Sequence, residues 1–280
     1  MEYRAKKSLG QNFLKSEPAL REIVKAGEIK SDDVILEIGP GKGALTKKLL
    51  EKASVVIAVE KDYELFDFLK MKFEKEIAEK KLVLLNEDIL EFDPLLISPL
   101  SGGEKTKYKI IANIPYNITG TILKKFLTAE HQPERMVLMV QHEVAKRITT
   151  PSPSSERRGG KESLLSISVK AYGEPSMIMK VPARYFSPAP KVDSAVILIK
   201  NISRNRFLPS LIKEGVGGGN SKDFEQKFWE IVKAGFAHKR KKLSGNLKML
   251  KNTNFDLGPE LGNKRAEDLT LADWLLLAKK

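Results

Sequence analysis

The stretch VILEIGPGKGA at residues 34–44 decides the fold of this 280-residue chain. Val34–Ile38 is a short run rich in β-branched apolar residues, as in a buried strand, and a glycine turn follows it. Residues 44–52 then have the pattern of a helix. Glycines in such a turn let a ligand approach the backbone closely, and the start of the helix supplies N–H donors. The stretch therefore predicts a βαβ unit with a ligand site at its first turn.

The same alternation of strands and helices continues through the first half of the chain, which predicts a mostly parallel sheet. The further expected strands are residues 54–59, 82–85, 108–112 and 135–140, and the further expected helices are 63–79, 118–129 and 143–148. Residues 151–161 have the composition of a loop. Residues 164–172 and 192–200 are strand-like without a helix between them, so we expect an antiparallel pair at the edge of the sheet.

The pattern becomes helical from Phe224 onward, which predicts a second domain. Residues 201–222 end in a glycine-rich run at 215–219 and are interpreted as a linker region. The expected helices beyond it are 224–237, 243–250 and 271–277. The predicted fold class is thus α/β, with an α/β domain at 1–200 and a small all-helical domain at 201–280.

Composition limits the classes of function. The chain has 49 Lys and Arg against 36 Asp and Glu, and 16 of these basic residues lie in 201–280 against 9 acidic ones. Such a surplus attracts polyanions such as nucleic acids, although a lysine-rich soluble surface explains it equally well. The absence of cysteine excludes disulfides, thiolate catalysis and cysteine-based metal sites. No apolar run reaches the ~20 residues of a membrane span, so we expect a soluble, cytoplasmic protein.

The glycine turn and a later acid predict a nucleoside site. Gly39, Gly41 and Ala44 satisfy the dinucleotide pattern G-x-G-x-x-G/A, and Glu60 ends the next strand, where a carboxylate accepts both ribose hydroxyls. The same geometry suits the nucleoside half of S-adenosylmethionine, so this motif leaves both ligands open. Asp88, after the third strand, is placed to bind an adenine amino group, although acids after strands are common.

The tetrapeptide Asn113-Ile114-Pro115-Tyr116 favours methyl transfer. It ends a strand, where open α/β sheets bind their ligands. An exocyclic adenine amine is a poor nucleophile, but the Asn113 side-chain carbonyl and a backbone carbonyl can accept both of its protons. Tyr116 offers a flat surface on which a flipped base stacks. A dehydrogenase has no use for this set.

The chain resembles the rRNA adenine N6-dimethyltransferases, in particular the bacterial small-subunit type. Besides the motifs above, the resemblance rests on SLGQNFL at 8–14, NED at 86–88, YFSPAPKVDSAV at 185–196 and FAHKRKKL at 236–243. Two stretches depart from the family pattern: KESL at 161–164 lacks an expected Tyr-Gly or Phe-Gly pair, and the glycine run at 215–219 is atypical.

The resemblance implies a Rossmann-like class I methyltransferase domain with an antiparallel edge strand, followed by a basic helical domain. The cofactor would be S-adenosylmethionine, with no metal. The residues implied to bind it are Gln11, Asn12, Leu14, Gly39, Gly41, Glu60, Asp88 and Asn113. The residues implied to act at the target adenine are Asn113, Ile114, Pro115, Tyr116 and, by stacking, Phe186. Lys239, Arg240, Lys241 and Lys242 would form a helical surface for rRNA phosphates.

The implied reaction is N6,N6-dimethylation of two adjacent adenines near the 3′ end of 16S rRNA, within the 30S subunit or its precursor, by a monomer with a role in subunit biogenesis. Three alternatives stay open. A 23S rRNA methyltransferase of the macrolide-resistance type shares the catalytic motifs but not residues 185–196 or the basic C-terminal motif. A non-catalytic ribosome assembly factor would not need Asn113–Tyr116. A dinucleotide oxidoreductase leaves Asn113–Tyr116 and the basic tail unexplained.

Overall fold

The computed structural model describes residues 3–102, 106–153, 160–207, 221–248, 250 and 257–279. The chain forms two compact units. We call residues 1–146 and 173–202 the α/β unit, and residues 147–172 and 203–280 the helical unit. None of the helices within the described residues is long and apolar enough to cross a membrane.

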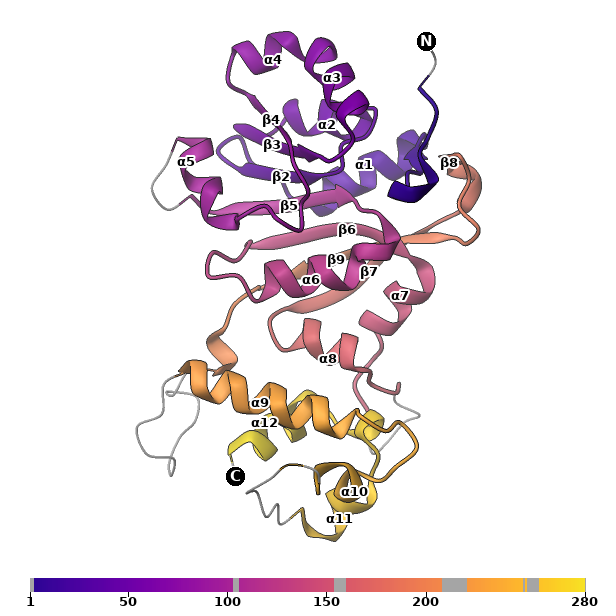
Figure 1. Ribbon diagram of the computed structural model, residues 1–280, viewed down its shortest axis with the longest axis vertical. Helices are drawn as coiled ribbons and strands as arrows, with labels where there is room; N and C mark the ends of the chain where they lie inside the picture. The colour runs from indigo at the N-terminus through magenta and orange to yellow at the C-terminus, as the bar shows by residue number, and fades with distance from the viewer. Residues whose placement is uncertain are drawn as a thin grey trace. The chain divides into compact units, whose positions relative to one another are not determined.

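The α/β unit is built on a seven-stranded sheet in the order β4-β3-β2-β5-β6-β9-β7 (Figure 1). Its strands are β2 (Val34–Ile38), β3 (Val55–Glu60), β4 (Leu82–Asn86), β5 (Tyr108–Asn113), β6 (Arg135–Gln141), β7 (Glu174–Val181) and β9 (Ser194–Lys200). The first five are parallel, whereas β9 pairs antiparallel with β6 and β7. The strand order reverses between β2 and β5, and open α/β sheets bind ligands at the carboxyl ends of the strands at such a point.

The other elements of this unit are helices and a two-stranded sheet of β1 and β8. They are η1 (Lys7–Leu9), β1 (Phe13–Leu14), α1 (Glu17–Ala26), α2 (Ala44–Leu50), α3 (Tyr63–Lys72), α4 (Glu74–Ala78), η2 (Pro94–Leu96), α5 (Ile97–Ser101), η3 (Tyr116–Ile118), α6 (Thr119–Leu127), η4 (Ala183–Tyr185) and β8 (Phe186–Ser187), with α7 (His142–Ile148) at the boundary of the two units.

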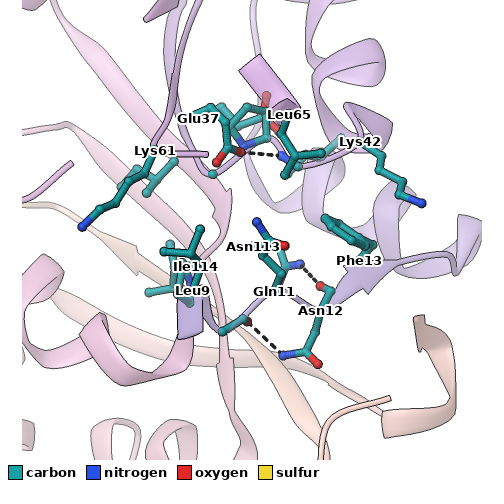
Figure 2. Close-up of a pocket in the computed structure, with 18 of the residues that line it drawn as sticks. Leu9, Gln11, Asn12, Phe13, Glu37, Lys42, Lys61, Leu65, Asn113 and Ile114 are labelled. Carbon is teal, nitrogen blue, oxygen red and sulfur yellow. Dashed lines mark hydrogen bonds between the residues drawn. The ribbon is translucent and has the colours of Figure 1, made fainter. Parts of the chain in front are cut away.

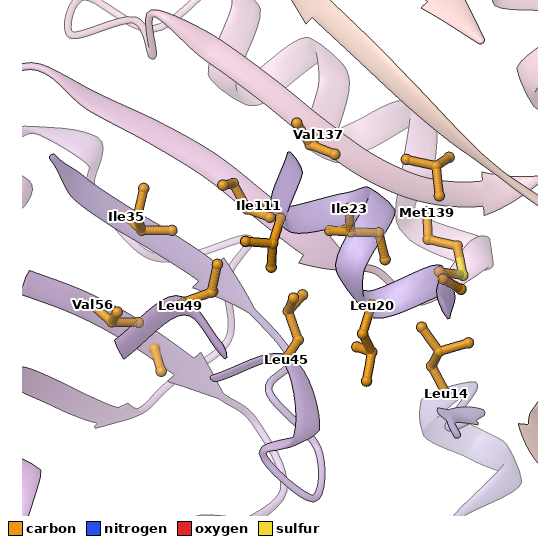
Figure 3. Close-up of a cluster of buried hydrophobic side chains, with 14 of the residues drawn as sticks. Leu14, Leu20, Ile23, Ile35, Leu45, Leu49, Val56, Ile111, Val137 and Met139 are labelled. Carbon is orange, nitrogen blue, oxygen red and sulfur yellow. The ribbon is translucent and has the colours of Figure 1, made fainter. Parts of the chain in front are cut away.

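The core lies between the sheet and helices α1 and α2 (Figure 3). Leu20 and Ile23 of α1 and Leu49 of α2 are buried against strand residues such as Ile35 and Ile111. Removing apolar side chains of this size from water stabilises the fold by roughly 1.5–3 kcal/mol each. This buried core fixes the positions of the strands, and with them the positions of the loops at the strand ends.

Two expected elements of secondary structure were wrong, one in each unit. The predicted helix at 63–79 breaks at Phe73, whose ring is buried where a Cβ on Gly43 would lie 2.5 Å from it. Residues 164–172 were expected to be a strand, but Leu164–Lys170 is helix α8. Ser163 begins this helix with a capping box, in which its side chain and that of Ser166 bond each other's backbone N–H groups. The antiparallel edge is confirmed, with β7 as the partner of β9.

The helical unit contains only helices within its described residues. These are α8 (Leu164–Lys170), η5 (Asn205–Phe207), α9 (Ser221–Gly235), α10 (Leu243–Leu247), α11 (Gly258–Asn263), η7 (Ala266–Asp268) and α12 (Leu271–Lys279). The expected second domain begins at residue 201, but the helical unit also includes the earlier residues 147–172. The buried Tyr172 explains the difference, since it stacks on Trp229 and bonds Glu225, both in α9. Of the expected loops, 154–159 and the glycine run at 215–219 lie outside the described residues.

Candidate active site

A cavity of about 670 Å³ opens at the carboxyl ends of β2, β3, β4 and β5 in the α/β unit (Figure 2). Every residue that the sequence implicated in cofactor binding lines it. These are Gln11, Asn12, Leu14, Gly39, Gly41, Glu60, Asp88 and Asn113, and Ile114, Pro115 and Tyr116 line it as well. The volume is in the range of sites for small molecules and cofactors.

The glycines in the turn after β2 expose their backbone to the cavity. Gly39, at φ +63°, would have no atom within 4 Å of an added Cβ, so its face points into open space. Gly41, at φ +60°, lies against the ring of Phe13, which an added Cβ would approach to 3.0 Å. Because positive φ strains other residues, only glycine keeps this backbone accessible to a ligand.

Glu60 ends β3 beside this turn and is 6% exposed. Its Oε2 accepts the Gly41 N–H at 3.1 Å, and its Oε1 accepts the Asp62 N–H at 2.9 Å. Burial raises the pKa of this carboxyl group. Each carboxylate oxygen has a second lone pair, so a carboxylate fixed in this way can still accept two hydroxyl protons.

Glu37 is a buried acid in the cavity wall that is not among the site residues predicted from the sequence. It is 1% exposed, and its Oε2 has no hydrogen-bond partner. Burial, together with a smaller contribution from the charge of the nearby Glu60, raises the pKa of Glu37 to about 8. A buried polar atom without a partner needs an explanation, and a ligand group in the cavity that Glu37 lines is the one that we use below. Its position within the strand-turn motif is the signal that could have identified it.

We expect Glu37→Gln to stabilise the protein increasingly as the pH rises. The unfolded chain loses the Glu37 proton above pH 4.5, whereas the folded protein keeps it up to about pH 8, so in the wild type this group makes folding less favourable over that window. The variant lacks this penalty, and its advantage in unfolding free energy should grow by on the order of 5 kcal/mol across the window. Urea unfolding at both ends of the window, with the exposed Glu91→Gln as control, measures it. An advantage that does not change with pH would contradict the expectation.

Asp88 lines the cavity, and each of its two carboxylate oxygens already accepts a hydrogen bond. Its Oδ2 is 2.6 Å from Lys61 Nζ, and its Oδ1 accepts the Leu90 N–H at 3.0 Å. The hydrogen bond from Lys61 lowers the pKa of Asp88. Lys61 has a largely exposed side chain, so an amino group of a ligand can replace it without opening the core.

Asn113 ends β5 and lines the cavity (Figure 2). Its Nδ2 donates to the backbone carbonyl of Asn12 at 3.1 Å. This bond turns the amide so that Oδ1 is the atom left to accept from another group. Tyr116, half-buried beside it, lies with its hydroxyl 2.5 Å from the buried Ser194 Oγ.

The positions of Phe186 and Gln11 do not match the roles that were expected of them. Phe186 is 4% exposed, belongs to the hydrophobic core and does not line the cavity, so its ring is not available for stacking on a base in this structure. Its β8 backbone pairs with Leu14. Gln11 lines the cavity, but its amide is engaged by Tyr3, Lys6 and Asp62.

The basic residues Lys239–Lys242 form a turn between α9 and α10, so the prediction that they lie on a helix was wrong. The helix ends at Gly235, and Asn246 Nδ2 donates to the carbonyls of Gly235 and His238. We call Lys239–Lys242 the basic turn; its residues are exposed, and Lys242 Nζ donates to Asn263 Oδ1. No group of three His, Asp or Glu side chains able to hold a metal ion occurs in the part of the chain that the structure describes.

Comparison with solved structures supports the fold. A dimethyladenosine transferase from Plasmodium falciparum superposes with a TM-score of 0.71 at 25% identity, covering 95% of each chain. The 23S rRNA methyltransferase ErmE superposes with a TM-score of 0.69 at 23% identity, covering 96% of this chain and 98% of its own. These matches confirm the class I methyltransferase architecture that the sequence predicted.

Comparison of sequences extends the likeness to the whole chain. "Ribosomal RNA small subunit methyltransferase A" of Francisella tularensis subsp. novicida is 39% identical over 283 residues, which cover 99% of this chain and 98% of the relative. The protein of the same name from Dehalococcoides mccartyi is 38% identical over 279 residues, which cover 97% and 86%. Residues 2–280 match the family described as ribosomal RNA adenine dimethylase. The chain therefore belongs to the ribosomal RNA adenine dimethylase family, and it is a methyltransferase.

Proposed function

We propose that this chain dimethylates N6 of two adjacent adenines near the 3′ end of 16S rRNA, using S-adenosylmethionine. We further propose that it acts as a monomer in the cytoplasm on the 30S subunit or its precursor, and contributes to subunit biogenesis. Family membership and relatives named for the small subunit support the substrate. The observation that supports the chemistry is that Asn113 lines the cavity with its Nδ2 bonded to the Asn12 carbonyl, which leaves Oδ1 as the amide atom that can accept from a substrate.

The residues around the cavity fit this cofactor. The open backbone at Gly39 and the two carboxyls Glu37 and Glu60 offer hydrogen-bond acceptors and space for a nucleoside and a cationic amino acid group. In the proposal Glu60 holds the ribose hydroxyls and Asp88 the adenine amino group. Asn12 and Leu14, from the start of the chain, also line the cavity. When bound, S-adenosylmethionine supplies a methyl group on a sulfonium, which is a good leaving group.

Asn113 and its neighbours would prepare the target amine. Asn113 Oδ1 and the backbone carbonyl of Ile114 accept the two amine protons and favour a pyramidal nitrogen whose lone pair points at the methyl carbon. Pro115 stiffens the turn, and the ring of Tyr116, held by Ser194, stacks on the flipped base. Alignment of nitrogen and methyl carbon supplies much of the rate, and the displaced amine proton passes to water.

The basic turn is the proposed contact with rRNA phosphates. We expect the double charge reversal Lys239→Glu and Arg240→Glu to weaken RNA binding by about ten-fold or more near 0.1 M salt, and to lower the slope of log affinity against log salt by about one per lost contact. Filter binding over a salt series measures both. Lys52→Glu with Lys70→Glu makes the same change of charge at exposed sites of the α/β unit. An equal loss in this control would show that only net charge matters.

The test of the function is transfer of labelled methyl groups. The protein is incubated with labelled S-adenosylmethionine and undermethylated 30S subunits, 50S subunits or free 23S rRNA, and the modified base is mapped. Label on two adjacent adenines near the 3′ end of 16S rRNA is expected. Label only in 23S rRNA would contradict the proposed substrate, and no transfer to any RNA with binding intact would favour an assembly factor.

A further inference from the structure

Asp62 lies two residues beyond Glu60 and is 2% exposed, but it does not line the cavity. Its Oδ1 begins helix α3 by accepting the Glu64 N–H at 3.0 Å. An N-cap needs only this one acceptor, and asparagine supplies it equally well. Asp62 nevertheless collects three further donors, all from the start of the chain.

These donors belong to residues 3–14, which we call the N-terminal segment. Tyr3 Oη lies 2.6 Å and Gln11 Nε2 2.9 Å from Asp62 Oδ2, and Lys6 Nζ lies 2.9 Å from Oδ1. Burial would raise the pKa of Asp62, but the hydrogen bonds from Tyr3, Lys6 and Gln11 outweigh it and lower the pKa to about 2. The group is therefore a carboxylate at neutral pH, and hydrogen bonds to a charged acceptor are the stronger kind.

The Gln11 amide joins the same network from its other side. Its Oε1 lies 2.7 Å from Tyr3 Oη and accepts the Lys6 backbone N–H at 2.7 Å. At the far end of the N-terminal segment, Leu14 pairs with β8, and the Lys15 N–H donates to the Tyr185 carbonyl at 2.8 Å. The segment is thus fastened at both ends, by Asp62 and by β8.

Asn12 lies between these two attachments and touches the reaction site. Its backbone carbonyl accepts the Asn113 Nδ2 at 3.1 Å, and its own Nδ2 donates to the Gly10 carbonyl at 3.0 Å. An amide is pseudo-symmetric, so its orientation is set by its neighbours. If the Asn12 carbonyl moved, the Asn113 amide could turn and present N–H donors to an amine that itself donates.

We propose that Asp62 is a positioning residue for methyl transfer, which fastens the N-terminal segment so that the Asn12 carbonyl holds the Asn113 amide with Oδ1 toward the target amine. This inference rests on the proposed function, because it assigns Asp62 to the same reaction. Asp62 does not line the cofactor cavity; its backbone N–H donates to Glu60, and its carboxylate acts on the reaction through the N-terminal segment.

Asp62→Asn is the direct test, since Asn keeps the Oδ1 cap of α3 but replaces the Oδ2 acceptor by a donor. We expect the single-turnover rate at saturating S-adenosylmethionine to fall by about ten-fold or more, since small displacements of reacting groups have large effects on rate. Asp93→Asn is the matched control, because Asp93 caps η2 and has no role at the cavity. Its rate should stay at the wild-type level.

A double-mutant cycle separates positioning from a general loss of stability. If Asp62 acts through Gln11, combining Asp62→Asn with Gln11→Ala should slow transfer no further than the slower single variant. The pair Tyr3→Phe and Gln11→Ala leaves the α3 cap untouched and should show the same loss, which keeps the test valid if Asp62→Asn folds poorly. Additive losses, or a wild-type rate in Asp62→Asn, would overturn the proposal.

Hydrogen exchange of the amides of residues 3–11 gives a readout that does not depend on activity. In Asp62→Asn their exchange should be faster by about ten-fold or more, while that of the β2–β3 core stays unchanged. Unchanged exchange in the segment would overturn the proposal. If the wild type methylates no RNA, the proposed function fails, and the exchange result still decides whether Asp62 fastens the segment.

Discussion

Asn113→Ala is expected to lower the rate of methyl transfer by about 100-fold or more, while the affinity for S-adenosylmethionine changes by less than about ten-fold. The reason is geometric. The Asn113 Nδ2 donates a hydrogen bond to the Asn12 carbonyl. This leaves Oδ1 as the preorganised acceptor for the target amine. Removing one preorganised group from a transition state has effects of this size, whereas most contacts proposed for the cofactor come from other residues.

Single-turnover kinetics and calorimetric titration measure the two quantities separately. Asn113→Asp is the informative second variant, because a carboxylate keeps an acceptor but cannot donate to the Asn12 carbonyl. It should also be slow. The exposed Asn205→Ala is the control for asparagine removal. A wild-type rate in Asn113→Ala would remove the proposed role of this residue.

Glu60→Gln is expected to weaken S-adenosylmethionine binding by about 10- to 100-fold, because hydrogen bonds to a charged group contribute about 1.5–3 kcal/mol each. The amide replaces one oxygen by a donor, which can no longer accept both a backbone N–H and a ribose hydroxyl. Burial raises the pKa of Glu60, so loss of its charge should leave the stability of the free protein equal or higher.

These opposite signs make the Glu60→Gln result easy to interpret. Affinity is measured by calorimetric titration and stability by thermal unfolding without cofactor. Weaker binding together with an unchanged or higher melting temperature supports the ribose role. Glu91→Gln, at an exposed acid outside the cavity, should alter neither. Unchanged affinity in Glu60→Gln would show that the ribose is held by other groups.

Local sequence patterns predicted most of the α/β unit. The strand at Val34–Ile38, the turn after it and the antiparallel edge strand were all confirmed, because burial of β-branched runs and positive φ at glycine are local properties of the chain. The predicted strand at 164–172 was wrong because contacts elsewhere in the chain outweigh its local pattern. Its β-branched residues favour a strand, but the capping box at Ser163 and packing within the helical unit make it a helix.

The candidate site likewise has features that the sequence predicted and features that depend on tertiary contacts. The sequence by itself predicted the cavity residues at the strand ends, because the carboxyl ends of neighbouring parallel strands meet at one edge of the sheet, whereas Gln11, Asn12 and Leu14 were implied by the family resemblance. Only the tertiary structure decided the burial of Phe186, the unpartnered oxygen of Glu37 and the attachment of the N-terminal segment to Asp62. These depend on contacts between residues as far apart as Tyr3 and Asp62, or Asn12 and Asn113, and no local pattern encodes the orientation of a side chain toward so distant a partner.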